Sequence, residues 1–369
     1  GSCVVMNVKT GEVLAMASYP DYNPQSFANG ITTSEWNSYR DNELHPLINR
    51  CIESPYEPGS IFKMVTAIAG LESGNVTLTE RINDTGVYTK YKNFQPKCWY
   101  YTDYHVGHGP LNVIGAIQKS CNYFFYETAD RMGIDILAKY AKYFGLGVKT
   151  GIELPNEATG TVASKEYAKS INVTWNPGDT INAAIGQGYN RFTSLQMAKY
   201  ISMIANGGNS IDVSIIKSIQ KPDGTTVSKE EIDNFVNEKL GFKNEDSNDD
   251  ITLNSQYLNA VKEGMNSVTS GEAGTAYVRF KDFDIEVGGK TGSAEAGKDK
   301  NGKDIVNAWF AAFAPYDEPE IAVVVMVENG GHGNYTAEAV RNIMAEYFGM
   351  NTQNVTEDMR AISYTESMR

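Results

Sequence analysis

The 369-residue sequence predicts an α/β fold in which both chain ends contribute strands to one sheet and the middle of the chain is mainly helical. Strand-like apolar runs gather near the two ends, and helix-like apolar periodicity recurs between them. The predicted strand segments are 3–18, 285–290, 308–313 and 321–327. We therefore expect one domain over residues 3–350, with a helical subdomain inserted at roughly 75–280 and a C-terminal tail at 351–369.

Turn residues and helix boundaries support these elements in order along the chain. Residues 3–18 place two apolar runs around a polar connection that contains Gly11, which is typical of a β-hairpin. Pro58-Gly59 interrupt the chain, Ser60 begins a helix, and Gly74 ends it. The other predicted helices are 111–131, 134–144, 194–206 and 337–348.

Composition argues against several classes of protein. Hydrophobic residues make up 41% and charged residues 21%, as in a soluble globular protein, and no apolar run is long enough to cross a membrane. The formal net charge of −13 disfavours nucleic-acid and anionic-lipid partners. Four cysteines are too few for a disulfide-built scaffold. We expect residues 228–251 to be a solvated surface insertion, and Gly1-Ser2 to be a cloning scar that follows a removed upstream segment.

The pattern S-x-x-K occurs three times, and its setting separates the copies. At Ser60–Lys63 the pattern begins a helix, where residues i and i+3 share a face and the helix dipole favours developing negative charge. The copies that begin at Ser214 and Ser218 lie in a strand-like run, where i and i+3 point to opposite faces. Only Ser60 and Lys63 are therefore candidate catalytic residues.

The patterns S-x-N and K-T-G also occur three times each. S-x-N at Ser73 ends the Ser60 helix and S-x-N at Ser170 is expected in a loop, which leaves Ser120–Asn122 beside a second helical segment. The K-T-G copies at Lys9 and Lys149 fit ordinary turns. The third copy, Lys290–Gly292, follows an extended run, so Lys290 can line a sheet edge while Gly292 lets another backbone approach.

These side chains suit acyl transfer to a serine. The hydroxyl of Ser60 needs a base, and Lys63 can serve once it is neutral. Burial and the second cation, Lys290, both lower a lysine pKa. Ser120 can relay a proton to the leaving amine, and Asn122 can donate to a substrate amide.

The third motif is suited to holding the substrate. The hydroxyls of Thr291 and Ser293 can bind a substrate carboxylate or carbonyl beside the charge of Lys290. A tetrahedral oxyanion needs two aimed donors, and we expect these to be the backbone N–H groups of Ser60 and Ser293. We expect the catalysis to use no cofactor.

Taken in order, the three motifs resemble the signature of penicillin-binding proteins and serine β-lactamases. Longer segments resemble class B penicillin-binding proteins, and most closely the elongation-type penicillin-binding protein 2. The resemblance runs over nearly all of residues 3–350. The segments that carry it are VVMNVKTGEVLAMASYPDYNP, EPGSIFKMVTAIAGLESG, WNPGDTINAAIGQGYNRFTSLQMAKYISMIANGG, VGGKTGSAEAG and AWFAAFAP.

This resemblance implies a transpeptidase fold with an antiparallel sheet, flanked by helices, and an inserted all-helical subdomain. It implies D,D-transpeptidation, which cross-links peptidoglycan stem peptides through a serine acyl-enzyme during cell elongation, with inhibition by β-lactams. It also implies the extracytoplasmic face of the bacterial plasma membrane, an N-terminal membrane anchor absent from this sequence, and a glycan polymerase of the shape-elongation machinery as partner.

Two positions depart from the common pattern of this family. Ile61 stands where threonine is usual, and we expect its side chain to face the other side of the helix. Ser293 stands where threonine usually follows K-T-G, which keeps the hydroxyl and loses a methyl group. The second difference is expected to change β-lactam affinity without abolishing acylation.

Two cysteines and two histidines fall within 24 residues at Cys98, His105, His108 and Cys121. Their spacing matches no compact zinc-finger pattern, so buried thiols and loop histidines explain them equally well. A disulfide between Cys98 and Cys121 is a further alternative in an oxidising compartment.

The family resemblance favours a metal site here, because some elongation-type relatives carry one at this place. It implies the ligands Asp84, Cys98, His108 and Cys121, with Asp103 and His105 in reserve. Four such ligands close a tetrahedral zinc shell, so the metal would be structural. It would fix the second motif, because Cys121 lies between Ser120 and Asn122.

Two other functions share the motifs. A serine β-lactamase would have to activate a water for deacylation, and turnover of nitrocefin would reveal it. A β-lactam sensor would be acylated once and would signal through a separate effector. A purely structural protein is disfavoured, because Ser60, Lys63, Ser120, Asn122 and Lys290 are all present.

Overall fold

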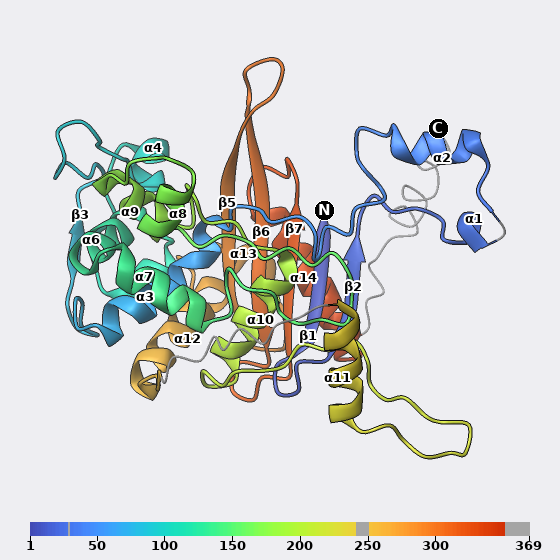
Figure 1. The fold of residues 1–369 in the computed structure, drawn as a ribbon. Helices are drawn as coiled ribbons and strands as arrows, with labels where there is room; N and C mark the ends of the chain where they lie inside the picture. The colour runs from blue at the N-terminus through green and yellow to red at the C-terminus, as the bar shows by residue number, and fades with distance from the viewer. Residues whose placement is uncertain (29, 241–250, 351–369) are drawn as a thin grey trace.

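A five-stranded antiparallel sheet organises the computed structural model, which describes residues 1–28, 30–240 and 251–350 (Figure 1). The strand order is β2-β1-β7-β6-β5, so the strands from the start of the chain pair with those from its end. The strands are β1 (Ser2–Asn7), β2 (Val13–Ser18), β5 (Gly288–Lys298), β6 (Asp304–Ala314) and β7 (Ile321–Val327). The predicted α/β fold is confirmed; the tail at 351–369 lies outside the described residues.

Two helices sandwich the centre of this sheet. Helix α10 (Ser194–Ala205) packs against β1, β6 and β7, and α14 (Asn334–Tyr347) packs against β6 and β7 from behind in the view of Figure 1. Nearly every residue of β6 and β7 is buried, as expected for strands covered on both faces. The capping box of Thr193 and Gln196 begins α10. Both helices lie where the sequence predicts them.

A group of helices lies beyond β5 (Figure 1). Helix α12 packs against both β5 and α5, so it ties this group to the sheet. A two-stranded sheet of β3 and β4 lies at its outer side. These elements are α3 (Lys63–Glu72), β3 (Ile82–Asp84), α4 (Trp99–Tyr104), β4 (Gly109–Leu111), α5 (Val113–Gln118), α6 (Asn122–Met132), α7 (Ile134–Tyr143), α8 (Lys165–Ser170), α9 (Pro177–Ala184) and α12 (Ser255–Ser270).

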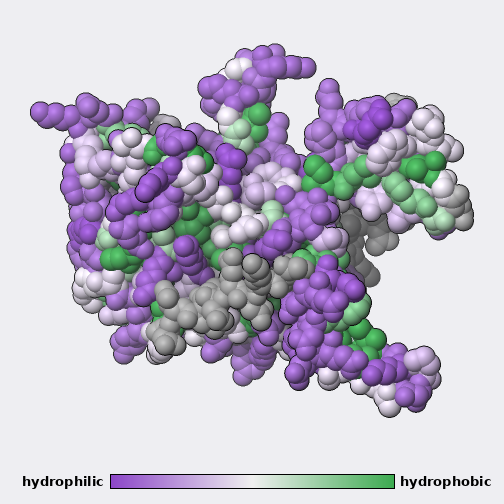
Figure 2. All heavy atoms as spheres, viewed as in Figure 1, coloured by the Kyte–Doolittle hydropathy of each residue, from purple (hydrophilic) through white to green (hydrophobic). Residues whose placement is uncertain are grey.

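The remaining elements are short or lie at the surface. They are α1 (Gln25–Ala28), α2 (Thr33–Arg40), the 3-10 turn η1 (Gly59–Phe62), α11 (Lys229–Leu240) and α13 (Tyr277–Phe280). Helix α11 has no buried residue, as expected for a solvated insertion, and hydrophilic side chains dominate it in Figure 2. The rest of that insertion, 241–250, lies outside the described residues. Within the described part of the chain, no helix has the length and apolar character needed to span a membrane.

Four predicted elements are wrong in detail. The helix expected over 111–131 is two helices, because Ser120 has a φ of 52° and breaks the chain between α5 and α6. The strand expected at 285–290 begins at Gly288 and continues to Lys298, since its alternating small and polar residues pair with β6. The run after Val213 makes only isolated bridges, and Ser170 ends helix α8 instead of lying in a loop.

Candidate active site

Ser60 lies in a 3-10 turn that leads directly into α3. Its side chain is partly exposed, whereas its neighbours Gly59 and Ile61 are buried. The backbone N–H of Lys63 donates to the carbonyl of Ser60, which joins the turn to the helix. The predicted helix start is therefore a tighter turn that presents one hydroxyl between buried neighbours.

The first and third motifs are held together by a close approach of their backbones. Gly59 has a φ of 55°, and a Cβ atom built on it would lie 2.6 Å from the carbonyl oxygen of Ser293. A Cβ atom on Gly292 would lie 3.0 Å from Ile61 Cγ2 and from the carbonyl oxygen of Pro58. Gly59 has no room for a side chain and Gly292 has very little, so these residues set the gap between the first motif and strand β5.

Ile61 was predicted to face the other side of the helix, away from the site, and this prediction is wrong. It is fully buried, and its Cγ2 atom faces Gly292 of the third motif. The 3-10 turn rotates this side chain toward β5, which an α-helical start would not do. Ile61 therefore forms part of the packing between the first and third motifs.

Lys63 joins the first motif to the second. Its side chain is fully buried at the start of α3. The Nζ atom donates to the carbonyl oxygen of Ser120 at 2.7 Å, to Ser120 Oγ at 3.2 Å and to Asn122 Oδ1 at 2.6 Å. Three acceptors match the three donors of a lysine ammonium, so the second motif holds Lys63 in place.

Lys290 is the second fully buried lysine of the site. Its Nζ atom donates to the carbonyl oxygen of Thr291 at 3.0 Å. The Thr291 hydroxyl shares a 2.8 Å hydrogen bond with the hydroxyl of Thr275, while Ser293 lies exposed further along β5. The third motif thus presents hydroxyl groups along the sheet edge next to Ser60.

Burial controls the charges of these two lysines. It lowers the pKa of Lys63 to about 8. Burial also lowers the pKa of Lys290 well below its ordinary value, and the positive charge of Lys63 lowers it further. We assign the resting proton to Lys63, because its three acceptors favour the ammonium form. Lys63 must therefore lose this proton before it can act as a base.

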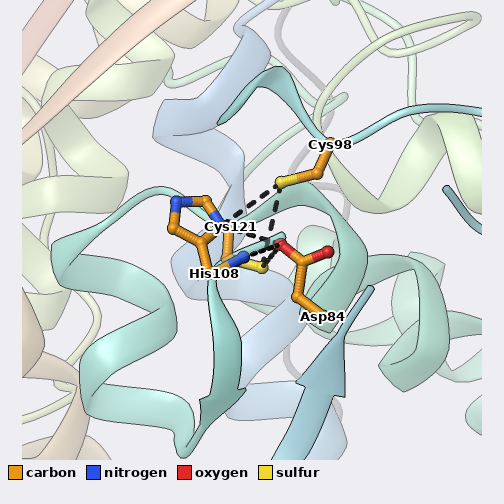
Figure 3. Close-up of side chains that lie close together, drawn as sticks. All are labelled: Asp84, Cys98, His108 and Cys121. Atoms are coloured by element: carbon orange, nitrogen blue, oxygen red, sulfur yellow. Dashed lines mark hydrogen bonds and ion pairs between the residues drawn. The ribbon is translucent and has the colours of Figure 1, made fainter. Parts of the chain in front are cut away.

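Asp84, Cys98, His108 and Cys121 converge behind the second motif (Figure 3). One donor atom from each residue lies within 4.8 Å of the others, and the four side chains come from separate turns and strands. The two sulfur atoms are 4.0 Å apart, and both cysteines are free thiols. The four residues named by the resemblance are thus brought together, whereas Asp103 and His105 are exposed and outside the cluster.

Hydrogen bonds prepare Asp84 as an anion. Burial opposes its ionisation, but donors on His108 and Gly86 outweigh burial and lower the pKa of Asp84 to about 2. The backbone N–H of Gly86 donates to Asp84 Oδ1, while Asp84 Oδ2 lies 2.8 Å from His108 Nδ1. One carboxylate oxygen is therefore turned toward the two thiols and the imidazole.

One family model matches nearly the whole chain. The model of the penicillin binding protein transpeptidase domain covers residues 1–345 of the chain. The chain belongs to this family.

Relatives and solved structures agree with this membership. The peptidoglycan D,D-transpeptidase MrdA of Acinetobacter baumannii is 31% identical over 355 residues, which are 93% of this chain and 50% of the relative. The structure of Pseudomonas aeruginosa PBP2 in complex with WCK 5153 is 33% identical with a TM-score of 0.81, covering 94% of this chain and 73% of that one. The structure of Helicobacter pylori PBP2 in complex with MreC has a sequence identity of 28% and a TM-score of 0.79. The match covers 95% of this chain and 60% of that one.

These matches confirm the predicted resemblance to penicillin-binding protein 2. The chain spans about half the length of the curated relatives it matches.

Several residues in or next to the motifs of this transpeptidase domain were not predicted from the sequence. Thr275 bonds Thr291, and the indole of Trp309 donates to the carbonyl of Glu57. Burial raises the pKa of Glu57 to about 7, although Arg191 opposes the shift. A charged residue three positions before the nucleophile is a signal that could have identified Glu57, but the other contacts join distant segments and leave no local pattern.

Proposed function

We propose that this chain is the catalytic domain of a serine D,D-transpeptidase that cross-links peptidoglycan stem peptides. The observation that carries the proposal is the buried Lys63, bonded to Ser120 and Asn122 of the second motif one turn after Ser60. A base, a proton relay and a partly exposed serine are what acyl transfer through a serine ester requires.

Acylation begins when Ser60 Oγ attacks the carbonyl carbon of the penultimate D-alanine of a donor peptide. Neutral Lys63 accepts the hydroxyl proton, and the backbone N–H groups of Ser60 and Ser293 stabilise the oxyanion. The C–N bond then breaks. Ser120 passes a proton to the departing amine of D-alanine, which leaves an ester on Ser60.

The second half of the reaction reverses these proton transfers. An amine of a neighbouring stem peptide attacks the ester, and Ser60 regains its proton as the new amide forms. Asn122 binds the donor amide, while Lys290, Thr291 and Ser293 hold its carboxylate or carbonyl at the sheet edge, and Gly292 keeps that edge close to Ser60. A β-lactam acylates the same serine because its strained amide occupies the donor position.

We also propose a setting for the whole protein, which its longer relatives support. We place it on the extracytoplasmic face of the bacterial plasma membrane, anchored by an N-terminal helix outside this sequence. We propose a role in cell elongation with a glycan polymerase of that machinery as partner. One neighbour is a PBP2 solved with MreC, and another is a peptidoglycan synthase complex described as coordinating polymerization and crosslinking, which supports the partner. Within this chain we assign 3–350 to the transpeptidase domain, with the helical insertion at roughly 75–280.

We also propose that Asp84, Cys98, His108 and Cys121 hold a structural Zn²⁺ ion. The fit is chemical: two thiols, an imidazole and a carboxylate lie close together, and zinc favours these donors. His108 turns Nδ1 toward the cluster, and the N–H of Phe124 donates to Cys121 Sγ at 3.4 Å, which helps to orient this sulfur. With four protein ligands, the ion would order the second motif and take no part in the reaction.

Labelling with fluorescent penicillin tests the catalytic proposal. The parent should form a stable adduct of one penicillin per chain, and Ser60→Ala should form none by intact mass. An adduct on Ser60→Ala at the parent's rate would overturn the assignment of the nucleophile. Steady turnover of nitrocefin would instead indicate a β-lactamase, and acylation without peptide cross-linking in the full-length protein would indicate a sensor.

A further inference from the structure

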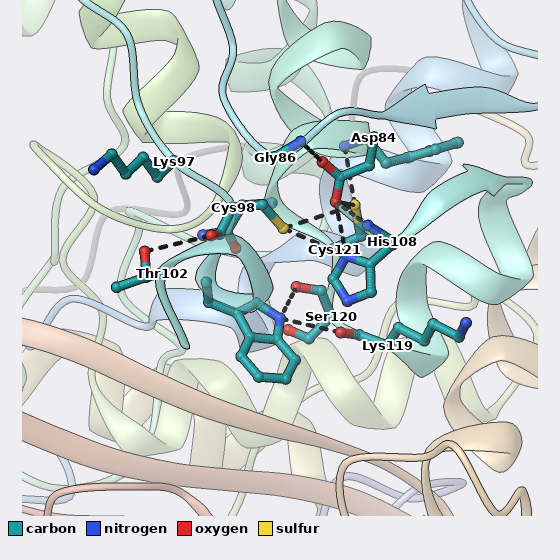
Figure 4. Close-up of polar contacts among 12 residues, drawn as sticks. Asp84, Gly86, Lys97, Cys98, Thr102, His108, Lys119, Ser120 and Cys121 are labelled. Atoms are coloured by element: carbon teal, nitrogen blue, oxygen red, sulfur yellow. Dashed lines mark hydrogen bonds and ion pairs between the residues drawn. The ribbon is translucent and has the colours of Figure 1, made fainter. Parts of the chain in front are cut away.

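The indole of Trp99 contacts the backbone of the second motif from another part of the chain. Its Nε1 atom donates to the carbonyl oxygen of Ser120 at 3.0 Å and to that of Lys119 at 3.1 Å. Figure 4 labels Ser120 and Lys119 together with Cys121 of the metal-ligand cluster. Trp99 is the first residue of α4, about twenty residues earlier in the sequence. One N–H group therefore spans two successive carbonyls of the turn between α5 and α6.

That turn has a conformation that needs support. Ser120 has a φ of 52°, a left-handed geometry that costs an ordinary side chain free energy. The geometry turns both the carbonyl and the hydroxyl of Ser120 toward Lys63 Nζ. If the turn relaxed, Lys63 would lose two of its three acceptors at once.

We infer that Trp99 is a positioning residue for catalysis, because its N–H group fixes the Ser120 turn and thereby the acceptors of Lys63. The carbonyl oxygen of Ser120 accepts one hydrogen bond from the neutral indole of Trp99 and another from the ammonium group of Lys63. The hydrogen bonds of Trp99 go to the backbone carbonyls of Lys119 and Ser120, so it acts through the turn that holds Ser120. The inference rests on the proposed roles of Ser60, Lys63 and Ser120.

The packing of Trp99 separates this role from a purely structural one. Its ring lies edge-on to Tyr100 and to His108, with centroids 5.5 Å and 5.8 Å away. Trp99→Phe keeps a smaller aromatic ring in this place and removes the donor. Benzothienylalanine at position 99 is a more specific test than phenylalanine, because sulfur replaces the N–H group and the size and shape of the bicyclic ring are kept.

Trp175 provides a matched control. Its Nε1 atom donates to Thr180 Oγ1 at 3.0 Å, the same length as the bond from Trp99 to Ser120. That bond joins no motif residue, and Trp175 is partly buried like Trp99. Trp175→Phe therefore reports the general cost of losing an indole donor.

The experiment separates binding of nitrocefin or penicillin from the acylation rate constant by stopped-flow kinetics. We expect the rate constant to fall roughly five- to tenfold in both position-99 variants, as for the loss of one ordinary hydrogen bond. The noncovalent dissociation constant and the bound zinc should match the parent, while the melting temperature should fall by only a few degrees, about as much as in Trp175→Phe. Trp175→Phe should acylate at the parent rate.

Three outcomes would overturn the inference. They are an unchanged acylation rate with benzothienylalanine, an equal loss in Trp175→Phe, or a loss that appears only in the dissociation constant. Should Trp99→Phe unfold, the isosteric variant still decides the question. Failure of the proposed function looks different, because the parent itself would then show no Ser60 adduct.

Discussion

The Nζ atom of Lys63 lies 2.6 Å from the Oδ1 atom of Asn122, so the base of the first motif is bonded directly to the second. The lysine side chain is fully buried, whereas Asn122 is partly exposed. In such surroundings the charge of Lys63 depends on a few neighbours and not on water. This dependence leads to a prediction about pH.

Acylation of Ser60 should rise with pH and level off above pH 8. Burial lowers the pKa of Lys63 to about 8, so its active, neutral form dominates only above that value. At pH 7 about a tenth of the molecules would carry neutral Lys63, and the rate should fall about tenfold for each unit below. The measurement is the second-order rate of penicillin labelling between pH 5.5 and 9.5. A flat profile would exclude a lysine base.

Lys63→Arg provides the matched test of this assignment. Arginine keeps the positive charge and remains protonated throughout the range, so the variant cannot accept the Ser60 proton. Labelling should fall by at least about a hundredfold at every pH. Labelling that still rises through pH 8 would show that another group is the base.

Gly59→Ala should reduce stability and acylation more than the same change at Gly74. Both glycines have positive φ values, 55° and 71°, so alanine is strained by about 1 kcal/mol at either position. A Cβ atom at Gly59 also collides with the Ser293 carbonyl, whereas nothing lies within 4 Å of one at Gly74. Comparing unfolding and penicillin labelling of the two variants isolates the collision. Equal losses would mean that the first and third motifs are not held by this contact.

The sequence predicts the chemistry of the site better than its geometry. Ser60, Lys63 and Lys290 could be selected because helix starts and extended runs leave local signals. The left-handed conformation of Ser120 could not be predicted, because apolar residues recur with helical spacing through 111–131 and no glycine or proline marks the break at Ser120. Trp99 and Lys63 both donate to the carbonyl oxygen of Ser120, and both are distant from it in sequence. Asp84 was found only through family resemblance, since its partners lie 14 to 37 residues away.

Removing zinc should lower the melting temperature and slow acylation together. The cluster lies directly behind Ser120, so free energy of metal binding would stabilise the turn that bonds Lys63. We expect chelation or Cys121→Ser to lower the melting temperature by at least about 5 °C. His105→Ala is the control, because His105 is exposed and outside the cluster. Less than about a tenth of an equivalent of zinc after metal-free purification would contradict the site.

Thr275→Val should weaken acylation by altering Thr291. The two hydroxyls are 2.8 Å apart, so valine leaves Thr291 free to rotate away from the substrate. Loss of one neutral hydrogen bond, worth about 1 kcal/mol, predicts a roughly fivefold fall in labelling efficiency. Thr275→Ser restores the hydroxyl and should recover most of the rate. Failure of serine to rescue would attribute the loss to packing.

Asn122→Asp should move the pH profile upward. The new carboxylate would occupy the place of the Oδ1 atom that Lys63 already contacts at 2.6 Å, with nearly the same shape. An opposite charge this close favours the ammonium form and should raise the pKa of Lys63 by about 1 to 3 units. Labelling should therefore be strongly reduced at pH 7 and partly recover above pH 9. Asn122→Leu removes the acceptor without adding charge, so it should lower the rate while shifting the midpoint downward. If both variants kept the parent midpoint, the contact between Lys63 and Asn122 would have no influence on the base.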